Sequence, residues 1–333
     1  MTDPSSGYEP GVDASRRRAA LVAGLLAALL AACTPGGTPP DGGDSSGPTQ
    51  GGASVLAVKI DNVGVARPQT GLDRADVVYA ERVEGGLSRL MAVYGTRVPE
   101  VVGPVRSARE TDLELLGQFS RPTLAFSGAQ RALLPAIAAA PLRAVTPDSA
   151  PGGAFYRGAD RPAPHNLYLR PGKLDRAVSG TNAGTLAGFT YAARVPEGGR
   201  PTSQRTVSFP AARFDFTWSG PQHRWLVSMD GRPATTASGT RLTAATVVVQ
   251  YVDIHDSRLH DKLGNASPVS RTVGSGRAEV LRDARAYPSH WTRPTPTSPT
   301  HFTPPTNTSP LPFAPGPTWI LLAQAPGTGG GRG

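Results

Sequence analysis

Apolar and polar positions from residue 55 onward alternate in short runs that predict strands. Val55–Ile60 is apolar and rich in β-branched residues, and it ends at Asp61–Asn62, which favours a strand that runs into a turn. Two further runs, 76–83 and 87–94, flank Glu84–Gly85–Gly86. Paired glycines permit the positive φ that a tight reversal needs. The pattern therefore predicts one strand followed by a hairpin.

The next segments change to helical spacing. Residues 110–119 carry apolar side chains at the intervals of an amphipathic helix, and Ser107 with Glu110 three residues later resembles a capping box. A short strand at 123–126 precedes a second helical pattern near 130–140. We therefore predict an α/β domain of mixed α+β type over residues 54–195.

Beyond Gly198 the chain consists of strand-like pieces separated by Gly, Pro and Asn, and no helical pattern is evident. The apolar run 319–323 is typical of a last strand. Residues 200–325 are thus predicted to form a smaller, β-rich C-terminal domain.

The N-terminal residues have the order of an export signal. Arg16–Arg18 precede the small and apolar run 19–32, which is too short to span a membrane and has the length of a signal-peptide core. Its end, Leu30-Ala31-Ala32-Cys33, resembles the lipobox of bacterial lipoproteins, in which the cysteine receives a diacylglycerol and becomes the first mature residue. A buried free cysteine is the alternative. Export by either the general or the twin-arginine route fits Ser15-Arg16-Arg17.

Residues 33–53 contain mainly Gly, Pro, Ser, Thr and Asp, a composition that favours a flexible tether. A diacylglycerol with a third, amide-linked acyl chain such as palmitate is enough for stable membrane anchoring. With residues 1–32 as the signal peptide, the expected location is the outer face of the bacterial cytoplasmic membrane, with the membrane as partner through Cys33.

Composition adds less than the pattern does. The 39 Gly and 34 Pro among 333 residues argue against a long helical bundle, and a single cysteine precludes an intrachain disulfide. Lys plus Arg exceeds Asp plus Glu by 34 − 25 = 9, nearly all from arginine. Such a bias is more typical of GC-rich coding than of nucleic-acid binding, so we expect no nucleic-acid partner.

The densest polar segment, Gly103–Arg109, places Arg106, Ser107 and Arg109 at a predicted helix start, where free backbone amides favour an anion. Arginine adds a bidentate fork for phosphate or carboxylate. Surface pairing with Glu110 or a neighbouring acid is the alternative.

A second candidate segment places His165 between Arg161 and Asn166 in a proline-rich loop that restricts its conformation. The histidine could contact a ligand or act as a general acid or base, or it could bond a backbone carbonyl structurally. Asp61 and Glu84, at strand ends, supply carboxylates for glycosidic chemistry, although such acids more often cap turns or pair with arginine.

Other chemistry lacks a motif. Neither a P-loop, a dinucleotide fingerprint nor a Gly-x-Ser-x-Gly elbow is present, and we expect no cofactor. His255-Asp256 and His260-Asp261 form a five-residue repeat without a cysteine, so no metal site is predicted.

Several segments in order carry a resemblance to a known family. They are residues 58–62, 66–94, 103–109, 155–168, 247–250, 273–283, 290–293 and 313–322. Together these segments resemble the YerB-type family of bacterial lipoproteins, which is known as a two-part domain of unknown function. The resemblance implies architecture and location rather than a reaction.

Three hypotheses on function follow. The first is a lipid-anchored protein that binds an anionic or polyhydroxylated envelope component, such as a wall-glycan fragment or a phosphate-bearing polymer, through Arg89, Arg106, Arg109, Arg161 and His165. The second is an envelope hydrolase or transferase that uses His165 with Asp61 or Glu84. The third is a scaffold for a membrane protein complex. The lack of a nucleophile motif favours binding over catalysis, and oligomeric state is left open.

Lipidation has a direct test. We expect the intact mass of the membrane-extracted protein to show an acylated Cys33 as its first residue, because the lipobox-like order directs modification there. A Cys33→Ala form that stayed membrane-bound would contradict this.

Overall fold

The computed structural model describes residues 55–174, 178, 180–261 and 264–326. All of them belong to one compact unit, which spans Gln50–Gly333. The predicted signal peptide, Cys33 and the tether lie outside the described residues. Among the described residues, no helix is both long and apolar enough to cross a membrane.

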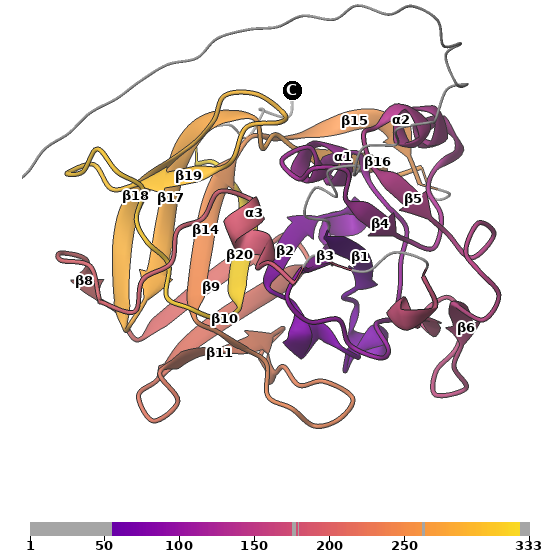
Figure 1. Cartoon of the computed structure of the whole chain (residues 1–333), viewed down its shortest axis with the longest axis horizontal. Coiled ribbons are helices and arrows are strands. Elements are labelled where there is room, and N and C mark those ends of the chain that lie inside the picture. Colours follow the sequence, from indigo (N-terminus) through magenta and orange to yellow (C-terminus); the bar gives the residue numbers. More distant parts are fainter. Residues whose placement is uncertain (1–54, 175–177, 179, 262–263, 327–333) are drawn as a thin grey trace, which may run out of the picture. The chain divides into compact units, whose positions relative to one another are not determined.

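A large mixed sheet forms the centre of the described unit, and Figure 1 shows β20 between β14 and β2. Of the described strands, β8 (Arg200–Pro201) is joined to it only through β18. The others follow the order β19 (His301–Thr303), β18 (Arg285–Arg293), β17 (Gly274–Arg282), β14 (Thr246–Val252), β20 (Thr318–Gln324), β2 (Val77–Arg82), β3 (Ser88–Tyr94), β1 (Leu56–Asp61), β4 (Thr123–Ala125), β5 (Arg143–Val145).

Smaller strand groups surround this sheet. One of them is a second sheet, and two are hairpins. The second sheet has the order β12 (Arg232–Pro233), β11 (Arg224–Met229), β10 (Ala212–Ser219), β9 (Gln204–Phe209), with β13 (Thr243–Ala244) paired to β11. The hairpins are β15 (Ile254–His260) with β16 (Ala266–Ser270), and β6 (Phe155–Arg157) with β7 (Leu167–Leu169).

Helices are few and short in the described residues. The α-helices are α1 (Glu110–Leu116), α2 (Leu134–Ala139) and α3 (Ala183–Leu186). Turns of 3-10 helix occur at Gly64–Ala66, Leu72–Arg74, Glu84–Gly86, Arg131–Leu133 and Pro171–Lys173. The predicted α/β class is therefore only partly right, because the fold is strand-rich and its helices are single or double turns packed on sheets. The absence of helix from 200 to 326, apart from the undescribed 262–263, matches the prediction of a β-rich second part.

The start of α1 corrects the predicted capping box. The residue before the helix is Arg109, whose backbone N–H donates to Asp112 Oδ2 at 2.7 Å. Asp112 therefore fills the role predicted for Glu110, two residues further along the chain. The N–H of Ala108 donates to Gly128 O and that of Asp112 to Arg109 O. These bonds occupy three of the backbone amides around the helix start.

The predicted hairpin is present, and its turn is also a packing point. Gly85 and Gly86 adopt φ of 67° and 72°. A Cβ on Gly86 would lie 2.6 Å from Pro210 Cβ, in the turn between β9 and β10. Only glycine fits this reversal without a shift of the second sheet.

Each face of the large sheet buries its own apolar core. On one face the second sheet contributes Phe214, Phe216 and Trp225, which join Trp319 and other residues of the large sheet. On the opposite face the short helices and the loop after α3 cover the sheet. Strands of both predicted domains contribute to both cores, so the two parts share one hydrophobic interior.

Leu321 tests this shared interior. It is fully buried in β20, opposite Val249 of β14 and Ala80 of β2. We expect Leu321→Ala to lower the free energy of unfolding by about 2–5 kcal/mol, the usual cost of a core Leu truncation. Urea unfolding followed by tryptophan fluorescence and far-UV circular dichroism should keep one transition. Val195→Ala, at a 42% exposed position, is the control and should change stability by less than about 0.5 kcal/mol. Two separate transitions would show that the parts unfold independently.

Candidate functional site

Charged residues face each other across three strands at one end of the large sheet. Arg89 of β3 lies opposite Asp61 of β1 on one side and Glu81 of β2 on the other. The segment after β3 returns along the end of β1, where Asp61 N donates to Pro104 O and Arg106 N donates to Lys59 O, both at 2.9 Å. These backbone bonds place Arg106 directly beside the row of charged side chains.

This end of the sheet forms the floor of a cleft of about 750 Å³. The lining is dominated by charged and polar side chains, with a few apolar ones at the walls. It comprises Asp61, Val63, Val83, Glu84, Leu87, Ser88, Arg89, Arg106, Ser107, Arg109, Ala129, Gln130, Arg131, Pro164, His260 and Asp261. We call it the arginine cleft.

Arg109 is committed to Glu84. Its Nε and Nη2 donate to the two carboxylate oxygens of Glu84 at 2.6 and 2.7 Å, and the Ser267 hydroxyl donates to the same carboxylate. Burial alone would raise the pKa of Glu84, but these hydrogen bonds and the Arg109 charge lower it below its ordinary value. The bidentate pair fixes one wall of the cleft and leaves Glu84 ionised.

Two side chains contact the same carboxylate oxygen of Asp61. His165 Nδ1 lies 2.8 Å from Asp61 Oδ2, and Arg106 Nε lies 3.0 Å from the same atom. The carboxylate therefore orients the imidazole. The Arg106 contact is an ion pair whose geometry falls short of a hydrogen bond, and no other bond of this guanidinium is made to a described residue.

Arg89 is a partly buried cation of the cleft without a carboxylate partner. Its Nη1 donates to Ser107 O at 3.2 Å, and no carboxylate among the described residues pairs with it within 4.0 Å. Burial, together with the neighbouring charges of Arg109 and Arg106, lowers the pKa of Arg89 to about 10. An anion in the cleft would relieve this repulsion.

A buried ionic triad lies on the same sheet face. Lys59, fully buried, pairs with Glu81 and, at 2.7 Å, with Asp112 of α1. Burial and the Asp112 charge raise the pKa of Glu81 to about 7, and Glu81 Oε2 has no hydrogen-bond partner among the described residues. One ammonium cannot neutralise two buried carboxylates, so the surplus favours a proton on Glu81.

The hairpin β15–β16 brings the second sequence region to the cleft. Ser267 accepts from Gln130 Nε2 at 2.9 Å while it donates to Glu84, and Ser270 N donates to Thr111 Oγ1 at 3.0 Å. His260 lies at the end of β15 and lines the cleft. Of the described residues, no group of three or more His, Cys, Asp or Glu is placed to hold a metal ion.

The structure gathers most of the predicted site residues. The cleft is lined by Asp61, Glu84, Arg89, Arg106, Ser107 and Arg109. His165 joins them through Asp61.

Two other predicted residues serve local structure instead. Arg161 donates to the carbonyls of Ala66 and Pro68 and pairs with Asp160. Asn166 bonds Gly158 O and accepts from Arg157, so neither Arg161 nor Asn166 lines the cleft.

Sequence reasoning missed Lys59, Asp112 and Ser267. Lys59 carried a usable signal, because a lysine inside an apolar, β-branched strand needs a buried partner. Ser267 carried none, since it lies far along the chain from Glu84.

These observations define a class of protein. Its members have two sequence regions that share one strand-rich interior, and a charged cleft that forms between distant segments of the chain. The chain belongs to the DUF3048 family of proteins of unknown function. The N-terminal domain of that family matches residues 42–184 and the C-terminal domain matches residues 205–320. The predicted resemblance to a two-part domain of unknown function is thereby confirmed.

A sequence and a solved structure, both of a YerB protein from Bacillus subtilis, are similar to this chain. The first is the "Putative lipoprotein YerB" of Bacillus subtilis, 34% identical over 125 residues; the aligned part is 37% of this chain and 37% of that protein's length. The second is the crystal structure of the YerB protein from Bacillus subtilis, with a TM-score of 0.66 and 21% identity over 81% of this chain and 91% of that chain. At that identity the structural likeness concerns the fold alone.

The raised pKa of Glu81 predicts a dependence of stability on pH. A carboxyl whose folded pKa lies near 7, against 4.5 when unfolded, holds its proton only in the folded state between these values. Its contribution to stability is therefore full below about pH 4.5 and is lost as the pH rises to about 7. Glu81→Gln should remove this loss, so the stability of the variant relative to wild type should increase from pH 4.5 to 7 in urea titrations. A difference that is constant or shrinks over this range would contradict the assignment.

Proposed function

We propose that the protein is a lipoprotein anchored through Cys33 on the extracytoplasmic face of the membrane, and that it binds an anionic cell-envelope component in the arginine cleft. The anchor is supported by the lipobox-like order and by the printed name of the similar Bacillus protein. The ligand class is supported by the geometry of the cleft.

The observation that carries the proposal is the pair Arg89 and Arg106. Glu84 binds Arg109 through both of its carboxylate oxygens, so Arg109 is not available to a ligand. Asp61 contacts only the Nε of Arg106. Arg89 donates one hydrogen bond to a backbone carbonyl and has no carboxylate partner among the described residues. The remaining N–H donors of Arg89 and Arg106 suit a phosphate or carboxylate. A bound anion would supply the negative charge that the surroundings of Arg89 lack.

The walls of the arginine cleft indicate what the ligand carries besides its anionic group. Val63, Leu87 and Pro164 offer apolar surface, while Ser107 and Gln130 offer hydroxyl and amide groups. Sugar rings have apolar faces and polar edges, and a cleft of this size accommodates a molecule of drug size or larger. A sugar phosphate unit of an envelope polymer therefore fits this combination better than a bare inorganic anion.

A second candidate function is hydrolysis or group transfer with His165 as general base. The bond from His165 Nδ1 to Asp61 favours it, because a carboxylate that orients an imidazole leaves Nε2 free for proton transfer. Glu84 does not suit this role, since both of its oxygens are engaged by Arg109.

Calorimetric titration with glycerol phosphate oligomers, glucosamine phosphate and muropeptides tests the binding proposal. We expect Arg89→Gln and Arg106→Gln each to weaken binding by about tenfold or more, because hydrogen bonds to a charged group contribute about 1.5–3 kcal/mol. Arg213→Gln, an exposed arginine paired with Asp215 outside the cleft, is the matched control and should bind as wild type does.

Equal affinities for the cleft variants and the control would overturn the binding proposal. In the same samples, chromatography of the recovered ligands tests for turnover. Turnover that His165→Ala abolishes while affinity persists would establish the second candidate instead.

A further inference from the structure

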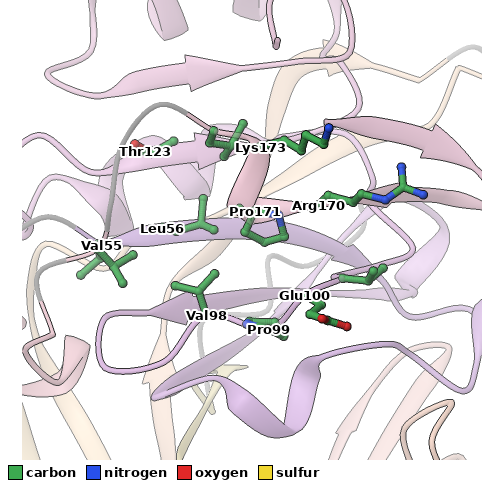
Figure 2. A pocket seen from close by; sticks show the side chains of 13 residues that line it. Val55, Leu56, Val98, Pro99, Glu100, Thr123, Arg170, Pro171 and Lys173 are labelled. Atoms are coloured by element: carbon green, nitrogen blue, oxygen red, sulfur yellow. The ribbon is translucent and has the colours of Figure 1, made fainter. Parts of the chain in front are cut away.

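A second large cavity lies at the other end of β1. Leu56 begins this strand and lines the cavity, whereas Asp61 ends it and lines the arginine cleft. The cavity has a volume of about 830 Å³ and also contacts Thr123, the first residue of the parallel strand β4. Figure 2 shows it from close by. It shares no lining residue with the arginine cleft.

Apolar side chains make up one side of this cavity. Leu56 forms part of the floor, and Val98, Pro99, Val101 and Pro171 belong to the walls. Val98 is 37% exposed, one of the large apolar side chains that the fold leaves in contact with solvent. A ligand that covered this apolar surface would gain free energy by removing it from water.

Three charged side chains also line this cavity. Figure 2 shows the charged ends of Arg170 and Lys173 to the right of Leu56 and Val98, whereas Glu100 lies next to Pro99. Two cations and one anion give the cavity lining a net positive charge.

The two cations of the cavity differ in their contacts. The guanidinium of Arg170 lies 3.7 Å from the centre of the Tyr156 ring, and its Nη1 donates to Gly153 O at 3.3 Å. These contacts hold Arg170 at the rim. Lys173 is exposed at the end of the 3-10 turn Pro171–Lys173, and its ammonium has no partner among the described residues.

We propose that this cavity binds a single-chain amphiphile with an anionic headgroup. Its apolar tail would lie over Leu56, Val98 and Val101, and its headgroup would meet Lys173 and Arg170. Separation of apolar and cationic surface within one cavity suits such a molecule better than a bare anion, which would leave the apolar side wet. The volume lies within the range of small-molecule sites.

The position along the chain points to the membrane as the source of this ligand. Val55, the first described residue, lines the cavity, and residues 34–54 connect it to Cys33. For a chain anchored at Cys33, this connection reaches at most about 70–75 Å even when fully extended. This point rests on the proposed anchor, whereas the chemistry of the ligand does not.

The experiment uses the full-length chain with Cys33→Ala, so that no attached lipid competes, and dodecyl phosphate below its critical micelle concentration as the probe. Calorimetry should show a saturable site that prefers dodecyl phosphate to dodecyltrimethylammonium and that is retained in Arg89→Gln. Val98→Asp should weaken binding by about tenfold, since loss of a buried Val-sized contact costs about 1.5 kcal/mol. Val195→Asp, an exposed valine outside the cavity, is the control and should have no effect.

Two further variants separate this site from the arginine cleft. Lys173→Glu should abolish the preference for the anionic headgroup, whereas Arg232→Glu, at an exposed position outside the cavity, should preserve it. Arg89→Gln should leave binding at the site lined by Lys173 unchanged. Unfolding temperatures equal to that of the parent would show that the variants fold.

Equal binding of both headgroups by the parent chain, or no effect of Val98→Asp, would overturn the proposal. Loss of binding in Arg89→Gln would also overturn it, because the probe would then occupy the arginine cleft. Failure of the envelope ligands to bind that cleft would leave the result here unaffected.

Discussion

The pairing of β20 with two neighbours is the constraint on which the rest of the structure depends. This C-terminal strand lies parallel to β14 on one side and to β2 on the other, so it joins strands from the two sequence domains. Thr318 to Leu321 pair on both sides and are buried. Without this strand the large sheet would divide into two halves with open edges. The two sequence domains therefore depend on each other for a complete core.

The shared sheet also explains how the arginine cleft forms. The floor comes from β1 and β3 of the first region, and one wall comes from the β15–β16 hairpin of the second. Ser267 connects them, because it bonds Glu84 and Gln130 at the same time. Two of the arginines that line the cleft contact carboxylates, Arg106 at Asp61 and Arg109 at Glu84, whereas no carboxylate among the described residues lies within 4.0 Å of Arg89. The cleft thus retains a partly buried cation without a carboxylate partner.

Local signals predicted much of this architecture. Three predicted runs are strands in the structure: the β-branched run before Asp61, the two strands of the hairpin and the apolar run 319–323. They could be predicted because the pattern of apolar residues along a strand is a local property of the sequence. The capping box was misplaced by two residues, since backbone bonds to Gly128 and side-chain bonds to Asp112 set where α1 begins. The helix content was overestimated for a related reason. Apolar spacing correctly predicted that these segments are helical, but tertiary packing kept each helix to one or two turns.

Sequence by itself determined the order of strands and turns, the family, and the residue types available for a site. The sequence identified Arg106, Arg109 and His165 as site candidates, because they lie in short segments whose conformation is restricted. Only the tertiary structure decided that Arg109 is bound by Glu84 while Arg89 is not, and that Arg161 serves its own loop. The physical reason is that charge pairing acts over a few ångströms in space, between residues that strand order brings together from distant parts of the chain.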